Sequence, residues 1–81
     1  MHKDEIQNLL STFGFAETLN KTLNGVNLTH MMHRSEKLKK LVEYKIDSLG
    51  MVNVIWGFDF TSDLAIIENT ADFETWLNKQ L

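Results

Sequence analysis

The residues most able to do chemistry in this 81-residue chain are the two histidines of the run His30-Met31-Met32-His33. If this run is helical, its spacing places both imidazoles on one side of the helix, where they could begin a zinc site. Such a site needs a third and usually a fourth ligand. Glu36 is the only nearby candidate and lies further round the helix, while Arg34 and Lys37 would repel a cation. We therefore expect no bound metal.

A second group of polar residues, in the segment 59–68, offers oxygen atoms without a known binding pattern. Asp59, Asp63 and Glu68 lack the spacing and the central glycine of a calcium-binding loop. The chain also contains no cysteine, no glycine-rich phosphate loop and no serine in a nucleophile elbow. We predict that the protein is not an enzyme and holds no cofactor.

Basic residues gather in the middle of the chain, although the formal net charge is −3. Residues 30–45 carry five basic and two acidic side chains, whereas residues 46–81 carry one basic and six acidic side chains. The basic segment is the candidate for contacts with phosphate groups. The residues that could make these contacts are His33, Arg34, Lys37, Lys39 and Lys40.

A helix-turn-helix motif is one way in which the chain could present this basic segment. It would need two helices between Phe15 and Lys40, with the turn at Gly25. Lys21 stands where the tight packing of such helices calls for a small residue, and the acidic C-terminal half repels nucleic acid. Nucleic-acid binding through residues 30–45 is therefore the alternative function and not the first one.

The aromatic run Trp56-Gly57-Phe58-Asp59-Phe60 could be a stacking platform for single-stranded nucleic acid. Such platforms interleave aromatic rings with lysine or arginine, and residues 46–75 contain neither. We therefore expect these rings, together with Trp76, to form the core beneath the helices. The opposite face of the strand is then the predicted surface for docking another protein. The candidate residues for partner binding are Asn53, Ile55, Asp59 and Asp63.

Helices are expected in the N-terminal part of the chain. Apolar residues over 6–13 follow the spacing of an amphipathic helix, which Gly14 ends. The four-residue spacing of the apolar residues over 15–23 predicts a second helix that ends at Asn24-Gly25. Thr29 can begin a third helix.

Strands are expected after residue 41. Residues 42–47 alternate apolar and charged side chains, which is the period of a half-buried strand. Residues 47–50 suit a type I turn followed by a left-handed glycine, which leads into a long strand over 52–60 and a short one over 64–68. The alternative is one long helix from residue 29 to residue 49 and a two-stranded hairpin.

These elements predict an α+β fold in a single domain of residues 1–81. It has an N-terminal helical hairpin, with or without a third helix, a three-stranded antiparallel meander, and a C-terminal helix that Thr70 caps and that packs on one sheet face. The absence of cysteine, of a signal peptide and of a membrane-spanning run predicts a cytoplasmic protein.

The function expected from these exclusions is a small non-catalytic module that docks to a partner protein as a regulator or inhibitor, in the manner of an immunity or antitoxin factor. The sequence does not identify the partner. It also leaves the oligomeric state open, a homo-oligomer included.

Overall fold

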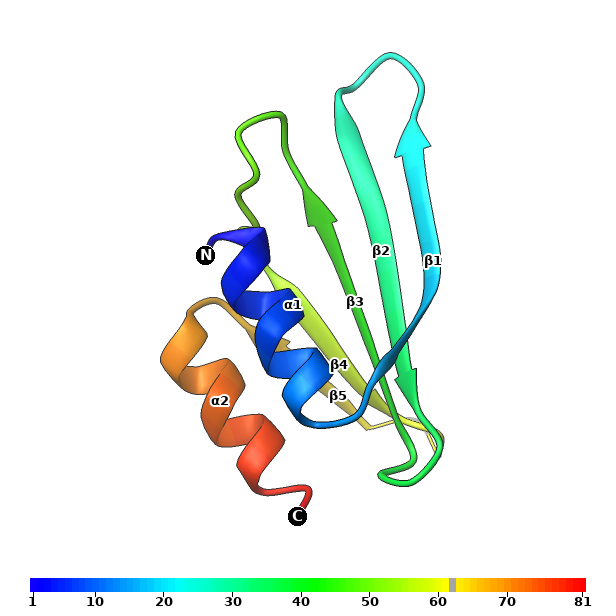
Figure 1. The fold of residues 1–81 in the computed structure, drawn as a ribbon, viewed down its shortest axis with the longest axis vertical. Coiled ribbons are helices and arrows are strands. Elements are labelled where there is room, and N and C mark those ends of the chain that lie inside the picture. Colours follow the sequence, from blue (N-terminus) through cyan, green and yellow to red (C-terminus); the bar gives the residue numbers. More distant parts are fainter. Residues whose placement is uncertain (62) are drawn as a thin grey trace.

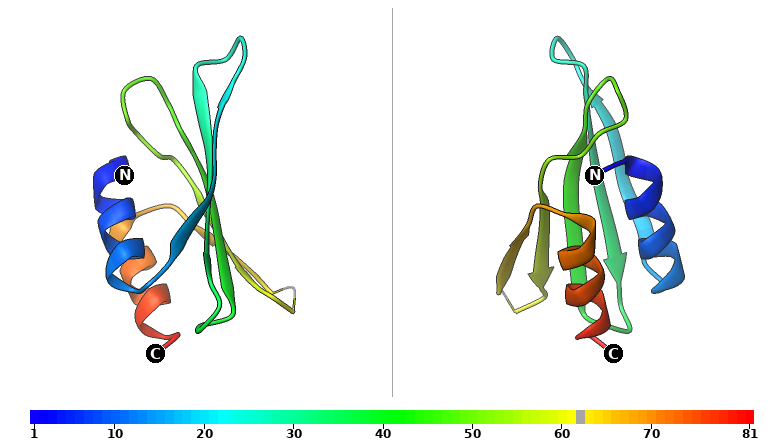
Figure 2. Two further views of the ribbon diagram at one scale, coloured as in Figure 1. Left: turned by 45° about the vertical axis from the view of Figure 1, so that its right-hand side comes forward. Right: turned by 90° about the vertical axis from the view of Figure 1, so that its left-hand side faces the viewer.

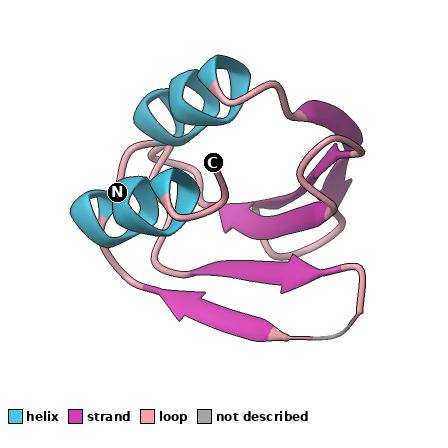
Figure 3. Ribbon diagram, turned by 90° about the horizontal axis from the view of Figure 1, so that it is seen from below, coloured by secondary structure: helices cyan, strands magenta, loops and turns pink. Residues whose placement is uncertain are grey.

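A five-stranded sheet and two helices make up the part of the chain that the computed structural model describes, residues 1–61 and 63–81 (Figure 1). Each strand pairs antiparallel with the next one in sequence, so the sheet order is β1-β2-β3-β4-β5. Both helices lie over the same face of this meander (Figures 2 and 3). In chain order the elements are α1 (Lys3–Thr12), β1 (Ala16–Leu23), β2 (Leu28–Ser35), β3 (Lys40–Ile46), β4 (Ile55–Asp59), β5 (Leu64–Ile67) and α2 (Thr70–Asn78).

The sheet is larger than the sequence patterns predicted, and the prediction of an N-terminal helical hairpin with a three-stranded sheet is wrong. The segments expected to be a second and a third helix form β1 and β2, so most of the regular structure is sheet. The coarse α+β class holds. The alternative with one helix over residues 29–49 is wrong as well, because β2 and β3 occupy that range.

β1 and β2 form a hairpin because Asn24-Gly25 acts as a turn between strands instead of as the end of a helix. Gly25 has a φ of 82° and Asn27 a φ of 48°, the left-handed values that tight hairpin turns use. The four-residue spacing that suggested a helix is also twice the two-residue period of a strand. It therefore places Leu19 and Leu23 on the same face of β1.

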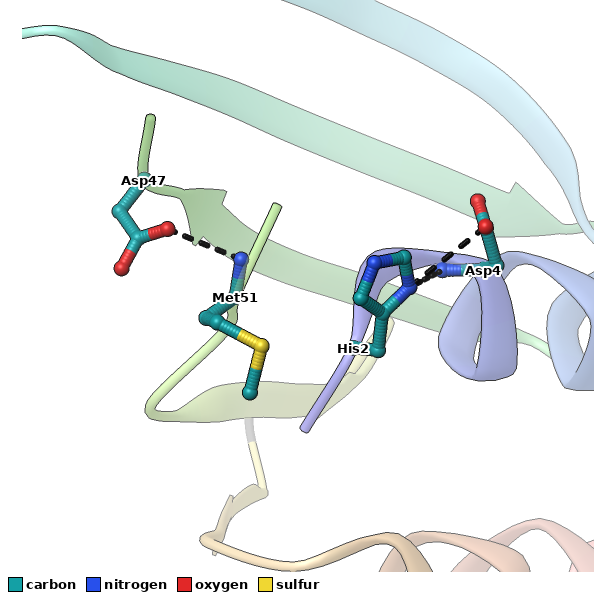
Figure 4. Close-up of polar contacts among 4 residues, drawn as sticks. All are labelled: His2, Asp4, Asp47 and Met51. Carbon is teal, nitrogen blue, oxygen red and sulfur yellow. Dashed lines mark hydrogen bonds and ion pairs between the residues drawn. The ribbon is translucent and has the colours of Figure 1, made fainter. Parts of the chain in front are cut away.

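α1 lies where the sequence predicts a first helix. The side chain of His2 accepts a hydrogen bond from the backbone N–H of Asp4 at 3.1 Å, which satisfies a free donor of the first turn (Figure 4). Ile6 and Leu10, on the predicted apolar face, are fully buried. Gly14 has a φ of 81°, which lets the chain turn from the helix into β1.

The expected turn over residues 47–50 is present after β3, but the strand expected over 52–60 is shorter and begins only at Ile55. Gly50 has a φ of 78°, and its N–H donates to the Asp47 carbonyl at 3.1 Å. Asp47 Oδ1 accepts hydrogen bonds from the N–H groups of Leu49 and Met51, each at 2.9 Å, of which Figure 4 shows the second. The chain then passes the N-terminus, where His2 and Met51 form an isolated bridge.

α2 confirms the predicted C-terminal helix, with its start one residue from the expected place. Asn69, and not Thr70, is the N-cap, and its side chain accepts a hydrogen bond from the N–H of Asp72 at 2.8 Å. Phe73 and Leu77, two of the residues on its predicted apolar face, are fully buried.

The core lies between the two helices and the sheet face that they cover. At one point the two layers are very close, because the ring of Trp76 lies over Gly57 of β4. Neither helix in the described residues is long and apolar enough to cross a bilayer. The buried apolar residues of the core are Ile6, Leu10, Phe15, Met31, Val42, Tyr44, Ile46, Val52, Ile55, Ile67, Phe73 and Leu77.

Candidate functional site

One face of the sheet has no helix over it, and we call it the open face (Figure 2). Successive side chains of a strand point to opposite faces. The buried residues Met31, Val42 and Ile55 point toward the helices, so their neighbours in each strand point the other way. The strand register places these residues side by side, and they are Leu19, Lys21, Leu23, Leu28, His30, Met32, Arg34, Leu41, Glu43, Lys45, Trp56, Phe58, Leu64 and Ile66.

Most side chains of the open face are apolar, although the free side of an antiparallel sheet is commonly polar. Leu64 and Ile66 are 53% and 61% exposed, and Met32, Trp56 and Phe58 are half-buried without a helix over them. Contiguous exposed apolar surface of this kind marks sites where proteins contact other molecules.

The apolar side chains of the open face form rows that run across the strands. In one row Leu41 pairs with Phe58, and Phe58 pairs with Leu64. In the next row Trp56 pairs with Ile66. Side chains that are directly opposite on antiparallel strands lie in contact distance. The apolar surface is therefore continuous from β3 to the outer edge of β5.

Positive charge accompanies the aromatic rings on this surface. The guanidinium carbon of Arg34 lies 4.2 Å from the centre of the Phe60 ring, just past the end of β4. Lys45 Nζ lies 5.5 Å from the centre of the Trp56 ring. Both contacts have the geometry of a cation–π interaction. They hold two cations beside the apolar centre of the open face.

The two histidines of the candidate metal pair lie on opposite faces of β2, because their spacing is an odd number of residues. His30 is on the open face, with Nε2 2.7 Å from Oε1 of Glu43. His33 is buried on the helix side, with Nε2 2.8 Å from Oη of Tyr44 and the two rings stacked at 5.5 Å. Among the described residues no group of three potential metal ligands comes together.

Burial sets the protonation of the His33–Tyr44 pair. Desolvation lowers the pKa of His33 below its ordinary value, and the charge of Glu17 offsets part of that shift. Burial also raises the pKa of Tyr44 to about 12. Both side chains are therefore neutral near pH 7, and they are packed against each other inside the molecule.

The four residues predicted to bind a partner do not share one surface. Ile55 is fully buried beneath the helices. Asp59 points to the same side and forms an ion pair with Lys40. Asn53 and Asp63 are exposed. The side of β4 expected to face outward is thus the covered one, and its aromatic side belongs to the open face.

The five candidate phosphate contacts are also dispersed. Lys37 and Lys39 are exposed and lie in the turn between β2 and β3. His33 and Lys40 point to the helix side of the sheet, as described above. Arg34 alone of the five reaches the open face. Residues 30–45 therefore form a hairpin with its charges on both faces and not one basic surface.

The outward face of β4 could not be read from the sequence, because nothing in the sequence sets its register against β3. The chain between Gly50 and Ile55 contains no regular strand. A shift of one residue in that segment exchanges the two faces of the strand that follows. Gly57 is the one residue of β4 that indicates which face is covered. A residue without a side chain fits the face against which a large ring such as that of Trp76 packs closely.

No known protein family, curated protein or solved structure matches this chain. Its function is therefore inferred from the open face itself. That surface offers apolar contact, aromatic rings and positive charge.

Proposed function

We propose that the protein is a small non-catalytic module that binds another protein through the open face. The observation that carries this proposal is the continuous apolar surface from β3 to β5, which ends at Leu64 and Ile66, 53% and 61% exposed. The core is already complete on the other side of the sheet, so this surface is not needed to bury the helices. Removal of such a surface from water favours association with a partner.

A regulator or inhibitor located in the cytoplasm is the role that we propose for this module. A chain that offers a binding surface without a reactive group acts on its partner by covering part of it. The lack of cysteine in the sequence supports a reducing compartment.

The charges of the open face support a partner of a different sequence. Three cations lie on this face, Lys21, Arg34 and Lys45, against two acids, Glu43 in β3 and Glu36 just after β2, which is ion-paired with Arg34. Two copies placed open face to open face would bring these cations together, which is unfavourable at an interface. An apolar patch with an acidic rim on another protein is the complementary surface.

The proposal is tested with two variants that add one positive charge at different places. Met32→Lys places a lysine in the centre of the open face, opposite Glu43 in the strand register. Thr75→Lys places one on the exposed side of α2. The partner is first isolated from lysate of the native host with the wild-type chain, and its affinity for each purified, folded variant is then measured by calorimetry.

We expect Met32→Lys to weaken binding at least about tenfold, because it removes an apolar contact from the centre of the interface and adds an ammonium group whose desolvation cost exceeds what its pairing with Glu43 returns. Thr75→Lys should bind as the wild type does. If Thr75→Lys loses affinity and Met32→Lys retains it, the partner contacts the helices and the proposal is wrong.

Single-stranded nucleic acid is the second candidate ligand, because Arg34 and Lys45 lie against aromatic rings on the open face. Rings beside cations are the components of a stacking platform. A short oligothymidine is titrated into the protein while tryptophan fluorescence is recorded at low and high salt. Quenching that disappears as salt rises would favour nucleic acid. The protein-binding proposal predicts no quenching at either salt concentration.

A further inference from the structure

β5 is the last strand of the sheet, and its outer edge has no neighbouring strand in the described chain (Figure 2). The N–H of Asp59 donates to the carbonyl of Asp63 at 3.0 Å, so these residues form a hydrogen-bonded pair at the start of the β4–β5 ladder. Bonded and non-bonded pairs alternate along an antiparallel ladder. Leu64 and Ile66 therefore belong to non-bonded pairs, and their backbone N–H and C=O groups point to the outer edge.

The outer edge of β5 lacks the features that protect sheet edges from pairing with another strand. The other edge strand, β1, carries Lys21 and a register shift between Glu17 and Leu19. β5 has the sequence Leu-Ala-Ile-Ile, without charge, proline or bulge, and pairs regularly with β4. Charges and bulges are the usual means by which a sheet edge is blocked. The edge of β5 is open to an added strand.

Acidic side chains flank β5 at both of its ends. Asp63 precedes β5 and Glu68 follows it, and both are exposed. Residues 46–78 contain six acidic side chains and no lysine or arginine. An added strand with basic residues at its two ends would therefore place opposite charges beside each other, which stabilises cross-strand pairs.

We propose that the outer edge of β5 binds an extended segment of the partner protein, antiparallel to β5, with apolar side chains opposite Leu64 and Ile66 and basic side chains near Asp63 and Glu68. The mode is strand addition, in which backbone hydrogen bonds give affinity and alternate side chains give specificity. This inference rests on the proposed function, because it supposes a protein partner. Leu64 and Ile66 also belong to the open face, so one partner can contact both surfaces.

A second copy of the chain is a less suitable occupant of this edge. Antiparallel pairing of β5 with β5 reverses one strand, so Asp63 of each copy would lie beside the Glu68 end of the other. Each copy also carries a net charge of −3. Both effects are repulsive.

The test uses two synthetic hexapeptides with blocked ends, KTVTVK and its acidic counterpart ETVTVE. Antiparallel to β5, each places valine opposite Leu64 and Ile66 and a charged residue opposite Asp63 and Glu68. Amide hydrogen exchange of the ¹⁵N-labelled protein is followed by NMR without and with each peptide. The amides of Ala65 and Ile67 are internal controls, since the alternation turns them toward β4.

We expect the Leu64 and Ile66 amides to exchange faster than the Ala65 and Ile67 amides in the free protein. The basic peptide should slow the Leu64 and Ile66 amides several-fold, and the acidic peptide should not. Equal protection by both peptides, or by neither, would overturn the inference. If the Leu64 and Ile66 amides are already protected in the free protein and light scattering gives the mass of a dimer, the edge pairs with a second copy of the chain. That result would also overturn the inference.

A charge-reversed variant provides the second arm of the test. In Asp63→Lys/Glu68→Lys the acidic peptide should protect Leu64 and Ile66, and the basic peptide should lose its effect. Met32→Lys changes the open face at β2, far from the β5 edge. Its Leu64 and Ile66 amides should still be protected by the basic peptide even if the variant no longer binds the partner protein. A failure of the open-face proposal is thereby distinguished from a failure of strand addition.

Discussion

Gly57 is the residue that decides how closely α2 approaches the sheet. A Cβ atom at this position would lie 2.7 Å from Cζ2 of Trp76 and 2.9 Å from Cη2, so the indole would have to move. Alanine is favoured over glycine in a strand interior by up to about 1 kcal/mol, whereas overpacking costs about 1 to 3 kcal/mol. We therefore expect Gly57→Ala to lower the free energy of unfolding, measured by urea denaturation.

A second pair of variants tests whether the contact with Trp76 causes this loss of stability. In a Trp76→Leu background the large ring is absent, and the same alanine should cost little or should stabilise the protein. An equal loss in both backgrounds would mean that the contact with Trp76 is not the reason for glycine at this position.

The buried imidazole of His33 makes stability depend on pH. Burial lowers its pKa in the folded state below the ordinary 6.5, so the unfolded chain takes up the proton more readily. Its contribution to stability is complete above about pH 6.5 and is lost as the pH falls from there through the lowered folded-state pKa. We expect the free energy of unfolding to fall over this window more steeply in the wild type than in His33→Gln, measured by urea denaturation at several pH values. Parallel curves for the two proteins would show that His33 does not titrate in this way.

Among the elements, the turn over residues 47–50 is held mainly by one carboxylate. Asp47 Oδ1 accepts two backbone hydrogen bonds at 2.9 Å, from Leu49 and Met51. Asp47→Ala leaves both exposed N–H groups to water and should cost about 1 kcal/mol, seen as a lower melting temperature. Asp47→Asn keeps an oxygen at the same place and should cost clearly less. If asparagine and alanine are equally destabilising, charge and not hydrogen bonding is the contribution of Asp47.

The sequence predicts the correct type of element for α1, α2, β3, β4 and β5, and in the first three of these one side faces the core and the other faces water. α1, α2 and β3 have this contrast, and their periods are clear in the sequence. β1 and β2 do not have it, because the open face is apolar and the covered side of β2 includes His33 and Ser35. The adjacent pair Met31-Met32 then shows no two-residue alternation, and the spacing of Leu19 and Leu23 fits a helix as well as a strand.

The candidate site was predicted less well than the fold, for a related reason. The aromatic residues of β4 share one face in any register, and that part of the prediction holds. Their direction depends on the irregular segment before Ile55, which has no periodic signal. The basic residues beside them, Arg34 and Lys45, come from β2 and β3 and are distant in the sequence. Local composition therefore could not show that cations and rings meet on one surface.

For the whole molecule, a complete core on one side of the sheet separates stability from binding. Phe73 is fully buried between α2 and the sheet, whereas Trp56 is half-buried on the open face. Phe73→Ala should cost about 3 to 5 kcal/mol in the free energy of unfolding. Trp56→Ala should cost less and should weaken partner binding. An equal loss of stability in both variants would place Trp56 in the core, as the sequence suggested.

The central claim is that the open face, and not the helix layer, contacts a protein partner. Methyl NMR of the labelled chain with one equivalent of unlabelled partner tests this claim most directly. We predict that the methyl signals of Met32, Leu41 and Ile66 shift or broaden, while those of Ala71 on α2 and Leu81 at the C-terminus stay unchanged. Changes confined to Ala71, Leu81 and the helices, with the open-face methyl groups unaffected, would contradict the account.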